Sequence, residues 1–323
     1  MGKLTVGMDA GSTNILARAS DAKNKILARN KQKTAPGEPL EATSRSMYEA
    51  ATAALSKAEA SWEDVEHVGI AIPSSIDPDT GDLLHAPNLG WQDEPALPKL
   101  KEVFGREVFL ENDVNCGTLG EFHLGAAKGT KHAVGLFVGT GLGGGVIING
   151  KLHTGLRGVA GEIGHHIVKY NGRKCGCGNR GCLEAYASKT GFGRKFNKLI
   201  NKKGKYSALE DEMGNKYKNV KSKALAKAYR AGDPVVVKVL QKGAYMLGVG
   251  TASIMAILAP ECVVYGGGVM EAFGEELLPH IKRGMADHLF GIKPDDVKLA
   301  ISTLGDDAVP LGAALLAQAK GNV

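Results

Sequence analysis

The chain has 323 residues, a formal net charge of +6, and 43% apolar and 23% charged side chains, proportions that are ordinary for a globular enzyme. No run reaches the roughly 18 apolar residues that a membrane-spanning helix needs, and a strand-like segment stands where a signal peptide would lie. Three of the five cysteines fall within eight residues, which fits metal binding in a reducing compartment better than a disulfide framework. We therefore expect a cytoplasmic protein without a membrane partner.

In chain order, the pattern first predicts two strands in 4–20 around a turn at 10–14 and a helix at 41–59. Strands follow at 65–72, 108–110, 134–138 and 146–148. The rest of the chain is predicted to hold a mostly helical segment at 188–240 with a polar break at 204–214, a helix at 245–258, a strand at 262–265 and a closing helix at 308–320. This alternation predicts an α/β protein with mixed sheets and flanking helices.

One layout occurs twice, because a strand hairpin with a Gly/Thr turn lies near residue 11 and again near residue 141. We expect two related halves that face a cleft. The small N-terminal domain is expected to comprise residues 1–115 with the last helix at 308–323. Residues 116–307 are expected to form the larger domain.

The net charge is concentrated in residues 194–230, which carry twelve Lys or Arg side chains against three acidic ones. A basic patch can bind nucleic acid. No interleaved aromatic residues or nucleic-acid motif accompany it, so we expect a solvated helical surface and no nucleic-acid partner.

Glycine supplies 44 residues, about twice the average share of roughly 7%, and gathers in the runs 139–145, 176–181 and 266–268. The first run matches G-x-G-x-x-G, but a strand follows it where the dinucleotide fingerprint requires a helix. A turn of this kind can instead form an anion-binding nest of backbone N–H groups. The residues concerned are Gly139, Thr140 and Gly141.

Residues 9–13 offer a second turn of this kind, in which Gly11, Ser12 and Thr13 supply backbone N–H groups. Asp9 adds a carboxylate that is suited to hold Mg²⁺ through its waters. Two ordinary hairpin turns are the alternative. Together with Gly267 and Gly268 after a later strand, the two turns favour a split phosphate clamp.

Residues 111–115 place Glu-Asn-Asp-Val-Asn at the end of an apolar strand, where open α/β sheets carry their active-site edge. Phosphoryl transfer to a hydroxyl needs a carboxylate that accepts the proton and a neighbour that orients the acceptor. Asp113 with Asn112 fits these roles. A helix N-cap is the alternative interpretation of the same residues.

His165, Cys175, Cys177 and Cys182 give His-x9-Cys-x-Cys-x4-Cys with intervening glycines. Four nitrogen and sulfur ligands without an open position describe a structural zinc site. His166 is the rival fourth ligand by spacing alone. Cys116 and Cys262 are expected to be small buried hydrophobes, and an ion here would position the flanking carboxylates Glu162 and Glu184 at the hydroxyls of a sugar.

Nearly the whole chain resembles the ROK family of repressors, open reading frames and kinases, and most of all its bacterial ATP-dependent glucokinases. The resemblance lies in the segments 9–13, 111–115, 139–145, 161–165, 175–184 and 266–268. It implies the two-domain actin-like ATPase fold (ribonuclease H-like), with residues 266–268 as the adenosine motif.

The same resemblance implies a set of residue roles. Asp113 is the implied base, His165 rather than His166 the zinc ligand, and the sugar ligands are Asn88, Asn112, Asp113, Glu162, His165 and Glu184. The chain departs from the family pattern at residues 73–77, where Pro-Ser-Ser-Ile-Asp stands, and at residues 86–91, a segment one residue shorter than usual.

We therefore expect an enzyme that moves the γ-phosphoryl group of Mg²⁺-bound ATP to the primary hydroxyl of a hexose, with glucose the first choice. Fructose, mannose or an N-acetylhexosamine are alternative acceptors, and polyphosphate is an alternative donor. A sugar-responsive transcriptional regulator is a disfavoured alternative, since Asp9 leaves no room for a preceding DNA-binding segment. The resemblance also implies a homodimer or homotetramer.

Overall fold

The computed structural model describes residues 3–34, 37–86, 89–214, 217 and 220–323. The chain forms two compact units. The first comprises Met1–Lys131, Gly145–Gly161 and Asp306–Val323, and the second comprises His132–Gly144 and Glu162–Gly305. The domain limits expected from the sequence, 1–115 with 308–323 and 116–307, stay a prediction.

The first large sheet has five strands in the order β3-β2-β1-β4-β8. Their bounds are β1 Leu4–Ala10, β2 Asn14–Ser20, β3 Ile26–Lys33, β4 Val65–Ile72 and β8 Phe109–Asn112. The inner strands β1 and β4 are almost wholly buried, as expected for strands covered on both faces. The edge strand β3 alternates exposed and less exposed residues. It carries the exposed Lys31 and Lys33, and charged side chains at a sheet edge oppose pairing with a strand of another chain.

Helices and a small sheet complete the first unit. The helices are α1 Leu40–Lys57, α2 Ala96–Phe104, α3 Asp113–His123 and α10 Ala308–Gln318, and the small antiparallel sheet has the order β5-β6-β7 with β5 Ser75–Ile76, β6 Leu83–Ala86 and β7 Trp91–Glu94. The apolar face of α1, with Met47 and Leu55, packs into one core with β1, β2 and β4.

The second large sheet has the order β11-β10-β9-β12-β13. Its strands are β9 Ala133–Val138, β10 Leu142–Ile148, β11 Lys151–Leu152, β12 Cys262–Gly266 and β13 Lys298–Ile301. The remaining helices are α4 Glu184–Ala187, α5 Lys189–Leu199, α6 Leu209–Met213, α7 Ser222–Arg230, α8 Pro234–Leu258 and α9 Gly267–Ala286. No helix in the described ranges is long and apolar enough to cross a membrane.

Both large sheets repeat one topology. Counted along the chain, the strands of each sheet lie side by side in the order third, second, first, fourth, fifth. In each sheet the fourth strand pairs in parallel with the first and the fifth. The layout that the sequence shows twice is therefore also found twice in the fold.

The predicted strands at 4–20, 65–72, 134–138 and 262–265 and the helices at 41–59, 245–258 and 308–320 are confirmed, with shifts at their ends. The sequence did not reveal β3, the small sheet, α2, α9 or β13, and the expected polar break at 204–214 contains the short helix α6. The strands missed in the small sheet are two to four residues long, too short for a periodic pattern to develop.

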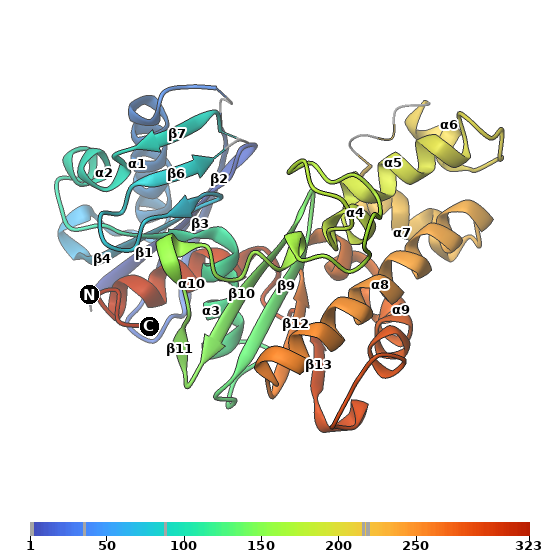
Figure 1. The fold of residues 1–323 in the computed structure, drawn as a ribbon. Helices are drawn as coiled ribbons and strands as arrows, with labels where there is room; N and C mark the ends of the chain where they lie inside the picture. The colour runs from blue at the N-terminus through green and yellow to red at the C-terminus, as the bar shows by residue number, and fades with distance from the viewer. Residues whose placement is uncertain (1–2, 35–36, 87–88, 215–216, 218–219) are drawn as a thin grey trace. The chain divides into compact units, whose positions relative to one another are not determined.

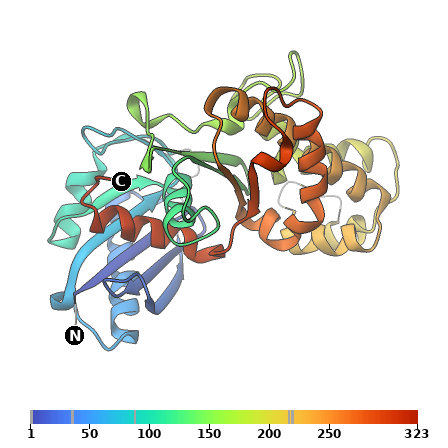
Figure 2. The same ribbon diagram turned by 90° about the horizontal axis from the view of Figure 1, so that it is seen from below.

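The last helix, α10, packs on the first sheet and on α3 (Figures 1 and 2). It approaches so closely because glycines stand on both sides of these contacts. A Cβ atom on Gly7 or Gly69 of the sheet would overlap the Pro310 or Ala313 oxygen of α10, and one on Gly312 of α10 would overlap the Cys116 oxygen of α3. At these positions glycine is needed because it has no side chain, and not because it can adopt unusual φ and ψ angles.

We expect Gly69→Ala to lower the free energy of unfolding by about 3 kcal/mol, because the added methyl group forces α10 away from β4. Urea unfolding measures the change. Gly139→Ala is the matched control, since its Cβ would meet no atom within 4 Å, and a change below about 0.5 kcal/mol is expected there. Equal effects of the two substitutions would contradict this account of the packing.

Candidate functional site

Three parallel strands of the first unit end at one edge of the sheet. Asp9 of β1 is aligned with Ala71 of β4, and Ala71 is aligned with Glu111 of β8. Because the carboxyl ends of neighbouring parallel strands share an edge, the residues that end β1 and follow β8 come together there. This edge brings Asp9 near enough to Asp113 for their charges to interact.

The turn after β1 is held by its own hydrogen bonds. The Gly11 N–H donates to the Asn14 oxygen at 3.0 Å, and the Thr34 hydroxyl donates to the Gly11 oxygen at 2.7 Å. Within the described part of the chain, the N–H groups of Ser12 and Thr13 meet no acceptor. The turn therefore presents two unused donors, as an anion-binding nest requires.

Asp9 lies among other acids. Burial and the nearby carboxylates of Asp113 and Asp306 raise the pKa of Asp9 to about 7, while Arg18 and Lys31 act in the opposite direction. A divalent cation at this place would reverse the balance, because it favours ionised carboxylates. Oxygen donors of this kind are what Mg²⁺ binds, directly or through water, so the residues present fit that ion.

Asn112 caps α3. Its side-chain oxygen accepts hydrogen bonds from the N–H groups of Val114 at 2.8 Å and Asn115 at 3.1 Å, and its Nδ2 donates to the Ser74 oxygen at 3.1 Å. Asp113 is the first residue of the helix, and its Oδ1 accepts from the Val114 N–H at 2.9 Å. The two interpretations of the sequence are thus compatible, since the cap is Asn112 and the carboxylate beside it belongs to Asp113.

Sequence reasoning assigned no role to Glu111, whose side chain supports the cap. Its Oε1 accepts the Asn112 N–H at 2.7 Å and the Asn115 Nδ2 at 3.0 Å. Burial raises the pKa of Glu111, while these hydrogen bonds act against the shift. The i, i+4 spacing of Glu111 and Asn115 was the available signal, but a strand ends between them, and spacing alone does not predict a contact across such a junction.

The departure at residues 73–77 has a structural role. The oxygen of the buried Ser74 hydroxyl lies 2.9 Å from the Ser75 oxygen and 3.1 Å from the His85 oxygen, and its one proton is shared between these two acceptors. The Ser74 carbonyl holds the Asn112 side chain. Ser74 therefore links the small sheet to the cap of α3. The other departure includes Asn88, which lies outside the described residues.

The glycine turn of the second unit lies between β9 and β10. The Gly139 oxygen accepts the Lys189 N–H at 3.1 Å, and the Thr140 oxygen accepts both the N–H and the hydroxyl of Thr190, at 3.2 and 2.8 Å. The carbonyls are thus fixed to the start of α5. No described residue accepts from the N–H groups of Thr140 and Gly141, which leaves these donors for an anion.

Gly267 and Gly268 begin α9, a helix of 20 residues. Gly267 has a φ of +80°, and a Cβ atom there would crowd the backbone of Val138 at 2.9 Å. The position therefore requires glycine, and the helix N-terminus carries the partial positive charge that favours phosphate groups.

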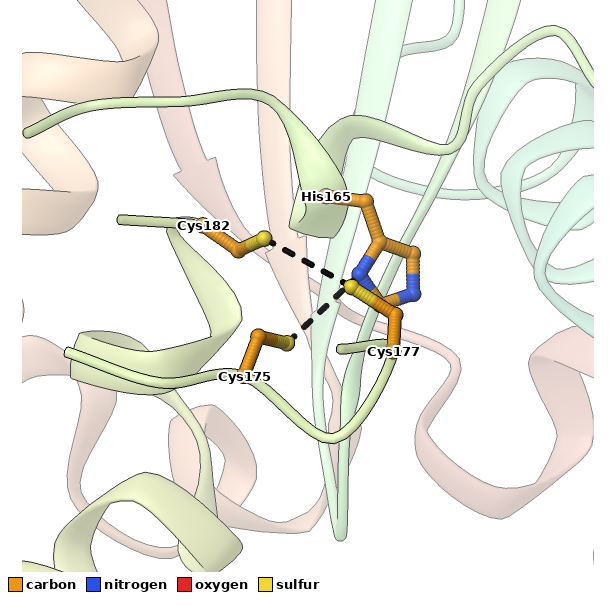
Figure 3. A group of neighbouring side chains, drawn as sticks. All are labelled: His165, Cys175, Cys177 and Cys182. Atoms are coloured by element: carbon orange, nitrogen blue, oxygen red, sulfur yellow. Dashed lines mark hydrogen bonds between the residues drawn. The ribbon is translucent and has the colours of Figure 1, made fainter. Parts of the chain in front are cut away.

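Figure 3 shows His165, Cys175, Cys177 and Cys182 pointing toward one another, with all four ligand atoms within 4.8 Å of each other. Cys175 Sγ lies 3.8 Å from His165 Nδ1, and Cys177 Sγ lies 3.7 Å from Cys182 Sγ. Ligands about 2.3 Å from a tetrahedral zinc ion stand about 3.8 Å apart. The donor set and its spacing therefore fit zinc.

His166 lies outside this cluster. Its Nδ1 is 2.5 Å from the Ile163 oxygen. The structure thus brings His165, and not its neighbour, to the three cysteines, a choice that spacing left open. Cys116 and Cys262 are buried, as expected for small hydrophobic side chains.

The two carboxylates beside the cluster differ in their surroundings. Glu162 Oε2 lies 4.0 Å from His165 Nε2, too far for a hydrogen bond. Glu184 Oε2 accepts the Leu142 N–H at 3.1 Å, and its Oε1 lies 3.4 Å from Cys175 Sγ. Glu184 therefore connects the cysteine cluster to the glycine turn, where a Cβ atom on Gly141 would lie 2.6 Å from its oxygen.

A folded-state pKa near 7 for Asp9, against 3.8 otherwise, means that the folded protein binds more protons than the unfolded chain between about pH 4 and 7. Stability falls as the pH rises through this window. We expect Asp9→Asn to raise the free energy of unfolding by about 4 kcal/mol at pH 8 without magnesium and by only about 1 kcal/mol at pH 4.5. Urea unfolding at both pH values measures this, and a difference independent of pH would contradict it.

The sequence profile of the ROK family matches residues 5–320. A glucokinase from Halalkalibacterium halodurans is 35% identical over 98% of this chain and 96% of its own length. A xylose repressor from Caldicellulosiruptor bescii is 29% identical over 95% of this chain and 76% of its own length. The crystal structure of a ROK family glucokinase from Streptomyces griseus, in complex with glucose and AMPPNP, superimposes with a TM-score of 0.81 at 33% identity and covers 98% of this chain and 99% of that chain.

These matches confirm the expected actin-like ATPase fold with its mixed sheets and flanking helices. They extend over both glycine turns, the edge that carries Asp9 and Asp113, and the cysteine cluster. The chain belongs to the ROK family.

Proposed function

We propose that this chain transfers the γ-phosphoryl group of ATP to the primary hydroxyl of a hexose, with glucose as the main acceptor and glucose 6-phosphate as the product. The glucokinase relatives support the reaction and the sugar. The observation that carries the proposal is the pair Asp9 and Asp113, held together at one sheet edge beside a turn with two unused N–H donors.

Asp113 is the base that accepts the proton of the sugar hydroxyl. Its place at the first position of α3 is fixed by the Asn112 cap and, behind it, by Glu111. Asn112 has one Nδ2 hydrogen beyond the one that Ser74 receives, and it can donate this hydrogen to a sugar oxygen. Most of the rate acceleration in such transfers comes from positioning and electrostatics.

The phosphates of ATP are bound by backbone donors. Gly11, Ser12 and Thr13 supply one set, Gly139, Thr140 and Gly141 supply the second, and the adenosine side of the nucleotide lies at Gly267 and Gly268. Asp9 helps to hold Mg²⁺, which supplies positive charge to the oxygens of the transferred group when it is bound. Without the ion, burial and the carboxylates of Asp113 and Asp306 make the ionised form of Asp9 unfavourable, which raises its pKa.

The zinc ion has a structural role, with His165, Cys175, Cys177 and Cys182 as its ligands. When His165 Nδ1 faces the ion, Nε2 on the other side of the ring is left to bind a sugar hydroxyl. Glu162 and Glu184 are the further sugar ligands of this unit, and Asn88 belongs to the sugar site of the first unit. Zinc thus orients sugar-binding groups and takes no part in the transfer.

Reduced thiolates at the metal site favour a reducing compartment such as the cytoplasm. The protein works as a homodimer or homotetramer, which light scattering of the purified chain tests.

We expect wild-type protein to release ADP fastest with glucose in a panel that also contains fructose, mannose and N-acetylhexosamines. Asp113→Asn should lower kcat by about 10²- to 10⁴-fold while glucose still binds, because an amide cannot accept the proton. Coupled assays measure ADP, and calorimetry measures sugar binding.

Asp287→Asn is the matched control for this substitution, since it makes the same chemical change at an exposed position of the second unit, beside Tyr245 and Arg283. It should leave kcat unchanged. Unchanged turnover in Asp113→Asn would show that Asp113 is not the base. A faster reaction with another hexose would show that glucose is not the main acceptor.

We expect Cys177→Ser to lower the zinc content and to raise the KM for glucose more than the KM for ATP, because the cluster orients the sugar side of the site first. Cys177 is the exposed cysteine of the four ligands, so its replacement disturbs the core least. Asn179→Ser, in the same loop, is the control and should keep its zinc. An equal rise of both KM values would mean general unfolding of the unit.

A further inference from the structure

A second concave site lies in the second unit. It is a cavity of about 620 Å³ between the cysteine loop and α5, and Cys175, Gly176, Ala185 and Gly191 form part of its wall. Five cationic side chains line it: Arg173, Lys174, Arg194, Lys195 and Lys198. We call it the basic pocket. Neither the turn at Gly139–Gly141 nor Gly267 and Gly268 line it, so it is separate from the proposed nucleotide groups.

No acid lines the basic pocket. Among the described residues, none of its five cations forms an ion pair within 4.0 Å. Other cations of this chain are paired, as Arg230 is with Glu276 at 2.7 Å and Lys99 with Glu94 at 2.7 Å. The positive charge of the pocket is therefore left without compensation by the protein.

The two arginines are nevertheless held in place by neutral groups. Arg173 Nη1 donates to the Ala185 oxygen at 3.1 Å, and its guanidinium lies 4.5 Å from the centre of the Tyr186 ring. Arg194 Nη1 donates to the Lys174 oxygen at 3.0 Å. Carbonyls and a ring fix these side chains without neutralising them, which is how a preorganised anion site is built.

This arrangement opposes stability in the absence of a ligand. Arg194 and Lys198 are like charges at i, i+4 on α5, a destabilising spacing. Arg173 and Lys195 are partly buried. Burial and the charges of Arg173 and Lys198 lower the pKa of Lys195.

We propose that the basic pocket binds a small anion that carries two or more phosphoryl groups. Five cations exceed what one phosphate group neutralises, and planar guanidinium groups match phosphate oxygens in pairs. A small ligand fits better than nucleic acid, because the site is concave, no aromatic residue stands among its described lining residues, and the Tyr186 ring is covered by Arg173. This binding lies outside the proposed reaction.

The test is calorimetric titration of the full-length, zinc-loaded protein with pyrophosphate, in the presence of saturating glucose, Mg²⁺ and AMPPNP, so that the proposed active site is filled. We expect one pyrophosphate per chain. The double variant Arg194→Glu/Lys198→Glu should bind it about 10- to 100-fold more weakly. Inorganic phosphate should bind more weakly than pyrophosphate, and a hexose bisphosphate serves as the organic arm of the same titration.

Lys223→Glu/Lys227→Glu is the matched control, because it makes the same charge change at i, i+4 on the exposed face of α7. It should bind pyrophosphate like the wild type. The pocket variant should keep its zinc and a cooperative unfolding transition, and these two measurements show that it is folded.

Three results would overturn the proposal: no pyrophosphate binding once the active site is filled, the same affinity in the pocket variant as in the wild type, or an equal loss in the α7 control. Binding of single-stranded nucleic acid without binding of pyrophosphate would also overturn it. None of these readouts needs sugar phosphorylation, so failure of the kinase proposal is distinguishable from failure of this one.

Discussion

Parallel pairing of β1, β4 and β8 is the constraint on which the first unit depends, because it places Asp9 and Asp113 at one edge of the sheet. Burial and charge repulsion at that edge raise the pKa of Asp9 to about 7. Hydrogen bonds fix the neighbouring groups: Glu111 accepts the Asn112 N–H, Asn112 caps α3, and the Ser74 oxygen accepts from the Asn112 side chain. A strained set of acids of this kind is typical of functional sites, where local stability is given up for a ligand.

The glycine-containing turns of the two units hold their backbone N–H groups in the same way. In each glycine-containing turn the carbonyls are occupied, by Thr34 in the first unit and by Lys189 and Thr190 in the second, while N–H groups of the turn have no acceptor among the described residues. Fixing the carbonyls fixes the direction of the neighbouring N–H groups, since a peptide plane moves as one piece. The repeated strand order of the two sheets explains why the same device occurs twice.

The cysteine cluster borders both the second glycine turn and the basic pocket. Glu184 joins Cys175 to the Leu142 N–H, so the metal site and the second glycine turn share a carboxylate. The other side of the same loop forms the wall of the basic pocket. One segment of about ten residues thus borders the proposed sugar ligands, the phosphate turn and a second anion site. Its glycines at 178 and 181 adopt φ values of +97° and +92°, which lets the chain turn sharply enough to do so.

The sequence by itself determined the α/β class, the buried strands β1 and β4, the two glycine turns and the three cysteines, because each depends on local pattern or on residues close together in the chain. The tertiary structure decided what depends on distant contacts. It chose His165 over His166, brought Glu111 to Asn115 across a strand end, and gave Ser74 its link to Asn112. It also gathered Arg173 and Lys174 with three cations of α5 around one cavity. Charge counted along the chain describes a basic segment, but only the packing of a loop on a helix turns it into a site.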